Sequence, residues 1–584
     1  MTDIYEIWQR FEKSKQYMQE KNILTKTEKN WLMYIGKQWE ACQNSEGMED
    51  LPSMNFIKPT VKYKVSSIAA TTVTALFSDL NGDREIPIGG VSFNEMGVPV
   101  PNVVTSSEVV GKMNDLFSIS WEKGKNKRQS KRGLSHAAVQ GDSYMCWLEG
   151  GDTRKPPQII HNTQMHLSNE NTMDIQSQTW LIIEERLDVD VVRERARLQG
   201  VSDKDIDLIR PDNATEDSLF NKREVKGKVT SLIYMEKDKK TGIVNIGRCV
   251  KDAMYEKLHP IQQNKAGEYS WRDKDGKMVN GVGLTRYPIV PMIWEEMPNN
   301  ARGMGEVEQL IPNQLELNKM LARRAISGKQ SAFPRLAYDD TSIANPEDLD
   351  KVGAAIKLNG GNAQAIGNMI AYLAPQSMSP DAQTLCDELL NNSRTLAGAS
   401  DAQLGNIDLS RVSGTAAQTI RDQQQIPLNE QQEMYQDYIE NVALLWCELW
   451  KVYYPDGIDW DGISLTAAEI QSVEPNVRVD IAEDTSLSKM ASQQELTNLF
   501  NNGKLTFKEY VEAYPEHSSI PKDVLRKIVA DREMQMQQTG MPPTDEFGNP
   551  IDVQLNQGVN VGGASGGSYQ SIQGQLAERP LVGE

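Results

Sequence analysis

The residues of this sequence that could support metal or acid–base chemistry are five histidines and two close pairs of aspartates. His161 and His166 lie five residues apart where a predicted strand gives way to a loop, with no HExxH motif and no cysteine partner. The pairs Asp188/Asp190 and Asp339/Asp340 supply the carboxylates that a nuclease uses to hold a metal, but no further carboxylates are in phase with them. We therefore interpret the histidines as turn and surface residues and the aspartates as solvated loop ends.

Motifs for nucleotide chemistry are also missing. The sequence has no GxxxxGK[ST] loop, and no GxGxxG follows a predicted strand. This argues against an NTP-driven motor, and we predict no catalytic residues, no metal site and no cofactor. A metal-dependent DNA-processing enzyme stays open as an alternative.

The composition is that of a globular chain with an acidic excess: 39% of the 584 residues are hydrophobic, 24% are charged, and the net charge is -19. That charge argues against a protein that coats nucleic acid or an anionic membrane, although weak attraction to DNA is compatible with a sliding contact. The five cysteines lie far apart, so neither a zinc site nor a disulfide framework is indicated. The charged start of the sequence leads us to expect no signal peptide, and no run approaches the roughly 18 apolar residues of a membrane span. We expect a reducing, aqueous compartment and no membrane partner.

Hydrophobic periodicity predicts an α+β chain. Apolar residues at helical spacing predict two helices within residues 1–45 and others over 59–80, 106–141 and 189–199. The stretch 81–104 is typical of a polar loop. From residue 143 to about 294 the period changes to two, with hairpin connections at 236–242 and 273–277.

Two sets of basic residues could contact nucleic acid or an acidic partner. For the first set we favour an exposed helix face that acidic neighbours balance. The second set lies on one helix, where such groups in a ring of subunits would steer a duplex without reading bases; salt bridges to neighbouring subunits are the alternative. The first set is Lys123, Lys125, Lys127, Arg128, Lys131 and Arg132, and the second is Lys319, Arg323 and Arg324.

Between residues 303 and 454 the sequence predicts an unusual order of parts. A helix runs to about residue 330, and Pro312 either kinks it or marks its true start. A compact insert of strands and a short helix, a second helix at 380–396, and a loop rich in glycine and serine follow. A long helical stretch, bent at Pro427, then covers 415–454. This order does not favour a buried catalytic pocket. It favours an element that stands in a ring and presents a flexible loop to the axis of that ring.

Four stretches follow one another in this order: YIGKQW (34–39) with the NFIKPTVKYKVSSIAA helix, YPIVPMIWEE (287–296) opening onto RGMGEVEQLIPNQLELNKML (302–321), the insert, and LSRVSGTAAQTIRDQQQ (409–425) before the long helix. Their order and spacing resemble those of the portal proteins of tailed double-stranded DNA bacteriophages. The resemblance covers nearly the whole chain.

The resemblance implies a mainly helical portal architecture of wing, stem, clip and crown that assembles as a ring, usually of twelve subunits. The wing, with helices and an α+β sheet region, would be residues 1–302. The stem helices would be 303–331 and 379–398, on either side of a small α/β clip at 332–378. The tunnel loop would be 399–416, the long kinked helix returning to the wing 417–459, and the helical crown 460–539. For the tail at 540–584, the composition, rich in Gly, Ser and Gln, predicts disorder.

Such a ring is the channel at one capsid vertex through which double-stranded DNA is packaged and later ejected. The implied location is the virion, after assembly in the host bacterial cytoplasm. The implied partners are further copies of the chain in a dodecamer, double-stranded DNA bound without sequence preference, terminase, major capsid and scaffolding proteins, and head-completion or adaptor proteins. A structural head adaptor that forms no ring is the other alternative.

The resemblance also implies site residues, in three groups. The tunnel-loop residues would touch DNA, the stem residues would face the channel or a neighbouring subunit, and the clip residues would dock the packaging and head-completion proteins. The groups are Asp401, Gln403, Asn406, Asp408, Arg411 and Ser413 in the loop; Lys319, Arg323 and Arg324 in the stem; and Arg335, Tyr338, Asp339 and Asp340 in the clip.

Overall fold

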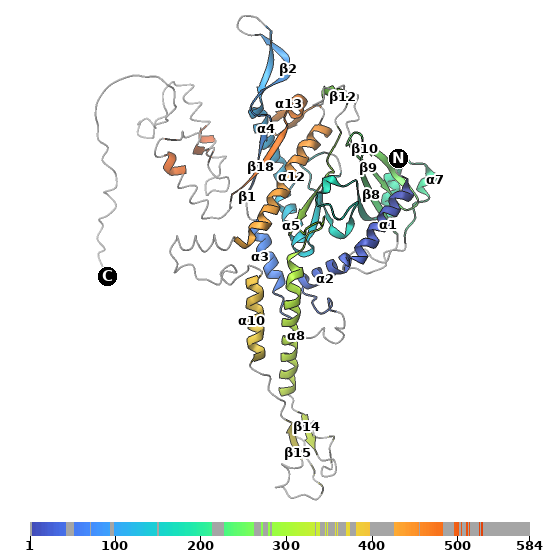
Figure 1. The fold of residues 1–584 in the computed structure, drawn as a ribbon, viewed down its shortest axis with the longest axis vertical. Coiled ribbons are helices and arrows are strands. Elements are labelled where there is room, and N and C mark those ends of the chain that lie inside the picture. The colour runs from blue at the N-terminus through green and yellow to red at the C-terminus, as the bar shows by residue number, and fades with distance from the viewer. Residues whose placement is uncertain are drawn as a thin grey trace, which may run out of the picture. The chain divides into compact units, whose positions relative to one another are not determined.

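The computed structural model divides the chain into two compact units, Met1–Ala482 and Glu483–Glu584. Every helix and strand named below lies in the first unit (Figure 1). The structure describes residues 3–42, 52–69, 72–93, 99–148, 151–212, 227–261, 270–272, 278–280, 283–332, 335–338, 345, 347, 357, 359, 370–373, 381–396, 426–454, 456–482, 496–500, 504, 510, 511, 513, 525 and 527–529.

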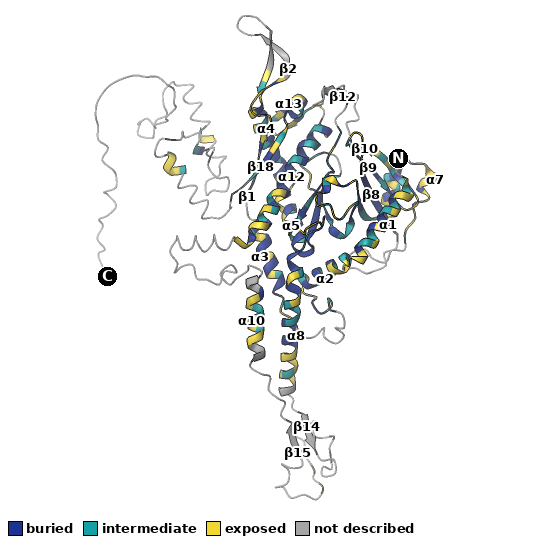
Figure 2. Cartoon of the chain, viewed as in Figure 1, coloured by how far each residue is buried: buried dark blue, intermediate teal, exposed yellow. Residues whose placement is uncertain are grey.

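Two long helices of the first unit differ in how they are buried. α12 (Asn429–Tyr453) has buried residues along its whole length, from Gln431 to Val452. α8 (Glu306–Ala332) is buried in its first half, but the side chains described beyond Ala322 are exposed or half-buried. Figure 2 shows this change along α8 from dark blue to yellow. The first half of α8 therefore belongs to the core and the second half does not.

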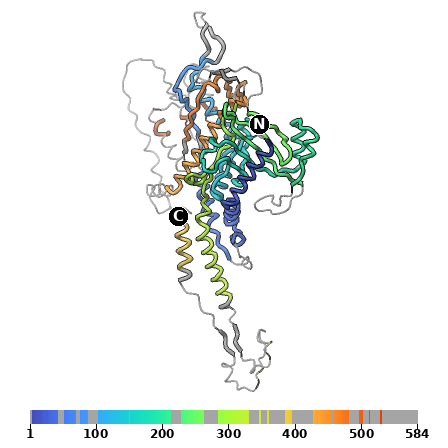
Figure 3. Tube along the Cα trace, turned by 45° about the vertical axis from the view of Figure 1, so that its right-hand side comes forward, coloured from blue at the N-terminus to red at the C-terminus, as the bar shows by residue number. Residues whose placement is uncertain are grey.

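A five-stranded antiparallel sheet of order β10-β9-β8-β7-β6 occupies the middle of the sequence. Successive side chains of each strand point to opposite faces of the sheet. Helices cover both of these faces. Ile7 and Phe11 of α1 (Ile4–Glu20) pack on the face that carries Ile182, Leu232 and Tyr234. The backbone trace in Figure 3 shows α1 in dark blue beside the strands of this sheet. Residues of α6 (Val189–Leu198) and α7 (Asp203–Ile206) form a second cluster with Val229 and Tyr255. The strands are β6 (Met165–Leu167), β7 (Trp180–Asp188), β8 (Lys228–Lys237), β9 (Val244–Cys249) and β10 (Met254–Pro260).

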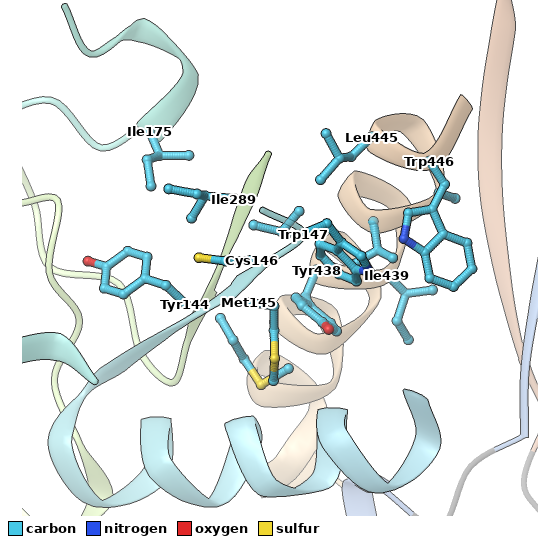
Figure 4. Packing of buried hydrophobic residues seen from close by; sticks show 14 of the residues in the cluster. Tyr144, Met145, Cys146, Trp147, Ile175, Ile289, Tyr438, Ile439, Leu445 and Trp446 are labelled. Carbon is cyan, nitrogen blue, oxygen red and sulfur yellow. The ribbon is translucent and has the colours of Figure 1, made fainter. Parts of the chain in front are cut away.

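The main core surrounds a three-stranded antiparallel sheet, β13-β4-β5. All five residues of its central strand β4 are buried, because α5 packs on β4 and α12 packs on β13. Trp147, directly after β4, meets Trp446 of α12 edge to face with ring centroids 5.9 Å apart (Figure 4). Aromatic pairs of this geometry add directional packing to area burial and fix α12 against the sheet. The elements are β4 (Asp142–Cys146), β5 (Gln158–His161), β13 (Ile289–Ile293) and α5 (Asn126–Gln140).

The first unit is closed by a pair of strands that are distant in sequence, β1 (Thr72–Asp79) and β18 (Pro475–Ala482). Each strand has an outward amide that a helix side chain satisfies. The Phe77 N–H donates to Asn114 Oδ1 of α4 (Ser106–Lys123) at 2.9 Å, and the Val479 N–H donates to Glu440 Oε1 of α12 at 3.3 Å. These contacts occupy part of each open strand edge, which would otherwise be available for pairing with another chain.

The prediction of one helix over residues 59–80 is wrong in its second half. α3 (Ile57–Ala69) ends there, and β1 begins at Thr72. Thr72, Val73 and Thr74 are β-branched residues that favour a strand, and β18 supplies the partner. The expected loop at 81–104 is instead largely a hairpin of β2 (Glu85–Phe93) and β3 (Pro99–Thr105).

The single helix predicted over 106–141 is two helices, α4 (Ser106–Lys123) and α5. The chain turns at Gly124 and Lys125, and Lys125 has φ +50°. A Cβ at Gly124 would lie 2.8 Å from the Ser120 carbonyl oxygen, so the turn requires glycine.

Other predicted elements are confirmed. These include two N-terminal helices, the helix at 189–199, both hairpins and the helix at 380–396. Pro312 does not start α8, which begins six residues earlier and continues through it. Pro427 lies in a 3-10 turn, η6, that precedes α12. The remaining bounds are α2 (Ile23–Ile35), η1 (Asn162–Gln164), η2 (Ile175–Ser177), β11 (Ser270–Arg272), β12 (Met278–Asn280), β14 (Arg335–Tyr338), β15 (Ile370–Leu373), α10 (Asp381–Leu396), η6 (Ile426–Leu428), β16 (Ile458–Trp460), β17 (Ile463–Leu465) and α13 (Ala467–Ser472).

The architecture of the described residues is thus α+β, with antiparallel sheets and segregated helices. Within those residues, none of the helices combines the length and the apolar character needed to cross a membrane.

Candidate functional site

The start of α8 is anchored by a buried arginine, Arg302. Its guanidinium donates to both carboxylate oxygens of Glu170, at 2.8 and 2.9 Å, and to the carbonyl oxygens of Asn162 and Met165, each at 2.8 Å. Asp142 lies 3.9 Å from the same group. Burial raises the pKa of the Asp142 carboxyl to about 6, against the opposing influence of Arg302. Arg302 therefore ties the segment before α8 to β4 and to the chain around β6.

Three glycines allow that segment to pass very close to the core. A Cβ on Gly141, whose φ is +104°, would lie 2.2 Å from the Gly303 carbonyl oxygen. A Cβ on Gly305 would lie 2.8 Å from the carbonyl oxygen of Val139. Backbone meets backbone here, so larger residues at these positions have no room. The glycines after Arg302 in the RGMG stretch are explained by this contact.

The first turn of α8 carries a buried ion pair. Lys64 Nζ of α3 lies 2.8 Å from Glu306 Oε2, and Trp294 Nε1 donates to the same carboxylate oxygen at 3.3 Å. Both charged side chains are almost fully buried. A carboxylate at a helix N-terminus is also favoured by the helix dipole. The pair therefore joins α3, the end of β13 and α8.

Two buried amides extend this anchoring along α8. Gln314 Nε2 donates to the Met54 carbonyl oxygen at 2.7 Å, and the Phe56 N–H donates to Gln314 Oε1 at 3.1 Å. Asn318, one turn later, accepts from the Met54 N–H at 3.1 Å and donates to Gln38. The first half of α8 is thus bonded through side chains to the segment before α3, which satisfies that segment's backbone.

The second half of α8 carries the predicted stem residues, and all three are exposed. Glu316 Oε2 lies 3.4 Å from Lys319 Nζ, and Glu316 Oε1 lies 3.9 Å from Arg323 Nη1. Arg324 makes no ion pair with any residue that the structure describes. Exposed pairs of this kind add about 1 kcal/mol or less to stability, so these residues are not held in place for the fold.

α10 packs along α8 and presents charge of the opposite sign. Asp387 and Glu388 of α10 are exposed and form no ion pair within the described part of the chain. Apolar residues are also left uncovered on both helices, with Ile326 of α8 44% exposed and Leu385 of α10 43% exposed. The helix pair therefore has unsatisfied charge and apolar surface.

The predicted clip is described only in part. β14 and β15 pair antiparallel, with Arg335 opposite Leu373 and Tyr338 opposite Ile370. Asp339 and Asp340 lie outside the described residues, as do all six tunnel-loop candidates. Those six are Asp401, Gln403, Asn406, Asp408, Arg411 and Ser413.

The interpretation of the histidines as turn and surface residues is wrong for three of them. His166 is buried, with Nδ1 3.0 Å from Ser14 Oγ and Nε2 3.6 Å from Glu184 Oε2. His136 and His161 are half-buried against Trp31, and burial lowers the pKa of His161 to about 3. These rings act as packing groups. No set of three or more metal-binding side chains comes together among the residues described.

The basic run predicted on one helix is divided between the end of α4 and α5. Lys123 pairs with Asp461, in agreement with the interpretation of a balanced face. Lys131 donates to Ser66 Oγ of α3 at 3.3 Å. This hydroxyl carries no charge and therefore does not balance the charge of Lys131. The balance expected at Lys123 therefore does not extend to the whole run.

No protein-family model and no curated protein matches this chain. Its residues and their arrangement are therefore the basis for a functional proposal. Sequence reasoning missed the anchor of α8, because Arg302 and Glu170 are 132 positions apart. The signal that was available is RGMG itself, an arginine followed by two closely spaced glycines at the start of a helix.

Proposed function

We propose that this chain is a portal protein of a tailed double-stranded DNA bacteriophage, a subunit of a ring at one capsid vertex through which DNA is packaged and ejected. The observation that carries the proposal is the order of elements from α8 to α12. An anchored helix, α8, leads into an insert with the β14–β15 pair, α10 returns to pack on α8, and α12 re-enters the core.

The geometry of α8 supports a role as one of the helices that form the wall of a ring. Its 27 residues span roughly 40 Å, since an α-helix rises 1.5 Å per residue. One half is fixed in the core by Arg302, Glu306 and Gln314, and the other half packs mainly on α10. A pair of helices alone buries little apolar surface, so neighbouring subunits are the natural cover for Ile326 and Leu385.

The charges of the helix pair support two roles for the predicted stem residues. Lys319, Arg323 and Arg324 would face a DNA channel, where summed positive charge guides a duplex without sequence preference. Alternatively they would pair with Asp387 and Glu388 of a neighbouring α10. In either role the chain is a structural protein and not an enzyme, and its insert would dock terminase and head-completion proteins.

The test is to purify the chain, image it by negative-stain electron microscopy and measure its native mass. Closed rings with a central channel are the expected result. A monomer or dimer that does not close into a ring, even when coexpressed with the capsid and scaffolding proteins, would favour the head-adaptor alternative. A monomer that cleaves DNA in the presence of divalent metal would favour the enzyme alternative and refute the proposal.

A further inference from the structure

One side of the first unit carries two adjacent helices that have basic residues and no acidic ones. α3 and α5 pack on each other, and neither contains aspartate or glutamate. We call the exposed basic residues of these two helices the basic face: Lys62 of α3, with Lys127, Arg128, Lys131 and Arg132 of α5. In a chain with a net charge of -19 this concentration of positive charge is unusual.

The first half of α12 has the opposite character. From Asn429 to Asn441 its charged residues are all acidic, and the first cation of the helix is Lys451. We call its exposed carboxylates Glu430, Glu433 and Asp437 the acidic face. Asp437 also lines a groove of about 270 Å³ between α12 and β13, together with Glu296, Asp174 and Met434. The groove contains one cation, Arg286, which already lies 3.3 Å from Glu448.

The arginines of the basic face and the carboxylates of the acidic face are not neutralised within the part of the chain that the structure describes. Lys62, Arg128 and Arg132 form no ion pair with a described residue, and the same holds for the three carboxylates of the acidic face. Mutual repulsion is visible in the acidic face, because burial and then the charge of Glu433 raise the pKa of Asp437. Burial and then the charge of Glu430 likewise raise the pKa of nearby Glu295. One molecule thus carries two arginines on the basic face and three carboxylates on the acidic face that form no ion pair with a described residue.

We infer that the basic face of one copy of this chain docks on the acidic face of a second copy, with Arg128 and Arg132 against Glu433 and Asp437. The spacing supports this pairing, because each pair is four residues apart on its helix and therefore shares one helix face about 6 Å apart. The groove beside Asp437 offers apolar walls for the stem of an arginine side chain.

The contact is head to tail, since the two faces are different surfaces of the same chain. A contact of this kind leaves both outer subunits with one unfilled face, so further copies add until a ring closes, provided that the rotation between neighbours closes. The inference rests on the proposed ring and adds the surfaces that join its subunits. A second copy is the occupant that we infer, because its acidic face supplies local charge of the opposite sign to the basic face.

Two charge-reversed proteins test the contact. In the first, Arg128→Glu and Arg132→Glu place carboxylates on both sides of the inferred contact; in the second, Glu433→Arg and Asp437→Arg place arginines on both sides. Each protein alone should need at least about tenfold more subunit to assemble, which corresponds to about 1.4 kcal/mol per contact. An equimolar mixture of the two should assemble like the wild type, because every contact in an alternating ring then joins opposite charges.

The control reverses the same amount of charge elsewhere. Lys239→Glu with Lys240→Glu lies in the exposed turn between β8 and β9 and should leave assembly unchanged. Recovery in the mixture would also show that the reversed proteins are folded. Assembly is read by native mass and electron microscopy over a dilution series.

The outcomes separate this inference from the proposed function. If the wild type forms rings and either reversed protein assembles equally well, the inference is wrong and the proposed function stands. If the two reversed proteins fail separately and also fail as a mixture, the inference is wrong as well. If the first reversed protein keeps its rings but loses binding to a DNA duplex, the basic face is a nucleic-acid contact instead. If the wild type forms no ring at all, the proposed function and this inference fail together.

Discussion

Replacing Arg302 with alanine should destabilise the first unit of this protein by about 3 kcal/mol or more. The side chain is 5% exposed and donates to Glu170 and to two backbone carbonyl oxygens. Its removal leaves the Glu170 carboxylate, which is 9% exposed, without its partner in a region of low polarity. Loss of one member of a buried ion pair typically costs about 3–5 kcal/mol.

The lower end of that range follows from the chemistry of the site. Asp142, with a pKa already raised to about 6, can take up a proton when Arg302 is lost and so avoid the cost of a buried charge. The carbonyl oxygens of Asn162 and Met165 cannot respond by taking up a proton, and they stay without a donor unless water enters. Entry of water requires the contact between Gly141 and the start of α8 to loosen.

The measurement is urea unfolding followed by tryptophan fluorescence, since Trp294 is fully buried close to this anchor. The matched control is Arg323→Ala on the same helix; its side chain is 64% exposed, and its loss should change the free energy of unfolding by about 1 kcal/mol or less. If the two variants lose similar stability, the reasoning that Arg302 anchors α8 is refuted.

Three further substitutions have defined outcomes. Asp142→Asn should become more stable relative to the wild type by about 2 kcal/mol as pH rises from 4 to 7, measured by unfolding at each pH. The sign follows because the folded pKa of Asp142, about 6, lies above its ordinary 3.8, so the stabilising proton is present below pH 3.8 and is lost as pH rises through 6. Gly141→Ala should cost at least about 2 kcal/mol more than Gly200→Ala in thermal unfolding; both glycines have positive φ, but only Gly141 has a backbone oxygen where the methyl group would go. Arg323→Glu should lower the yield of genome-filled particles without changing the stability of the subunit, and unchanged yields would exclude a role for this residue in packaging or ring assembly.

Local patterns predicted much of the fold where the interactions that stabilise an element are close in sequence. The helix at 189–199 and the hairpin around 236–242 carry their own periodicity and turn residues, and both are confirmed. The segment 72–79 shows the limit of this approach. Its residues continue a helical pattern of apolar spacing, and only the pairing with β18 decides for a strand.

The residues of the candidate site also divide into those whose environment the sequence could predict and those for which it could not. The exposure of Lys319, Arg323 and Arg324 follows from their places on an amphipathic helix, so periodicity could predict it. The buried pairs of Arg302 with Glu170 and of Lys64 with Glu306 join elements far apart in the chain. A charged residue gives no sign in the sequence that it will be buried, because burial depends on a partner that only the fold brings near. The histidines were misassigned for this reason.

The pairing of β1 with β18 also has a consequence for synthesis. Residue 79 and its partner at 475 are separated by nearly 400 positions. At a translation rate of about 5–20 residues per second, β1 leaves the ribosome roughly 20–80 s before the strand that completes it. During that time Phe77 and the other apolar side chains of β1 cannot have their native neighbours from β18 and α12. A nascent chain of this protein is therefore most exposed to aggregation and chaperone capture late in elongation, and any chain released before residue 482 keeps an unpaired strand.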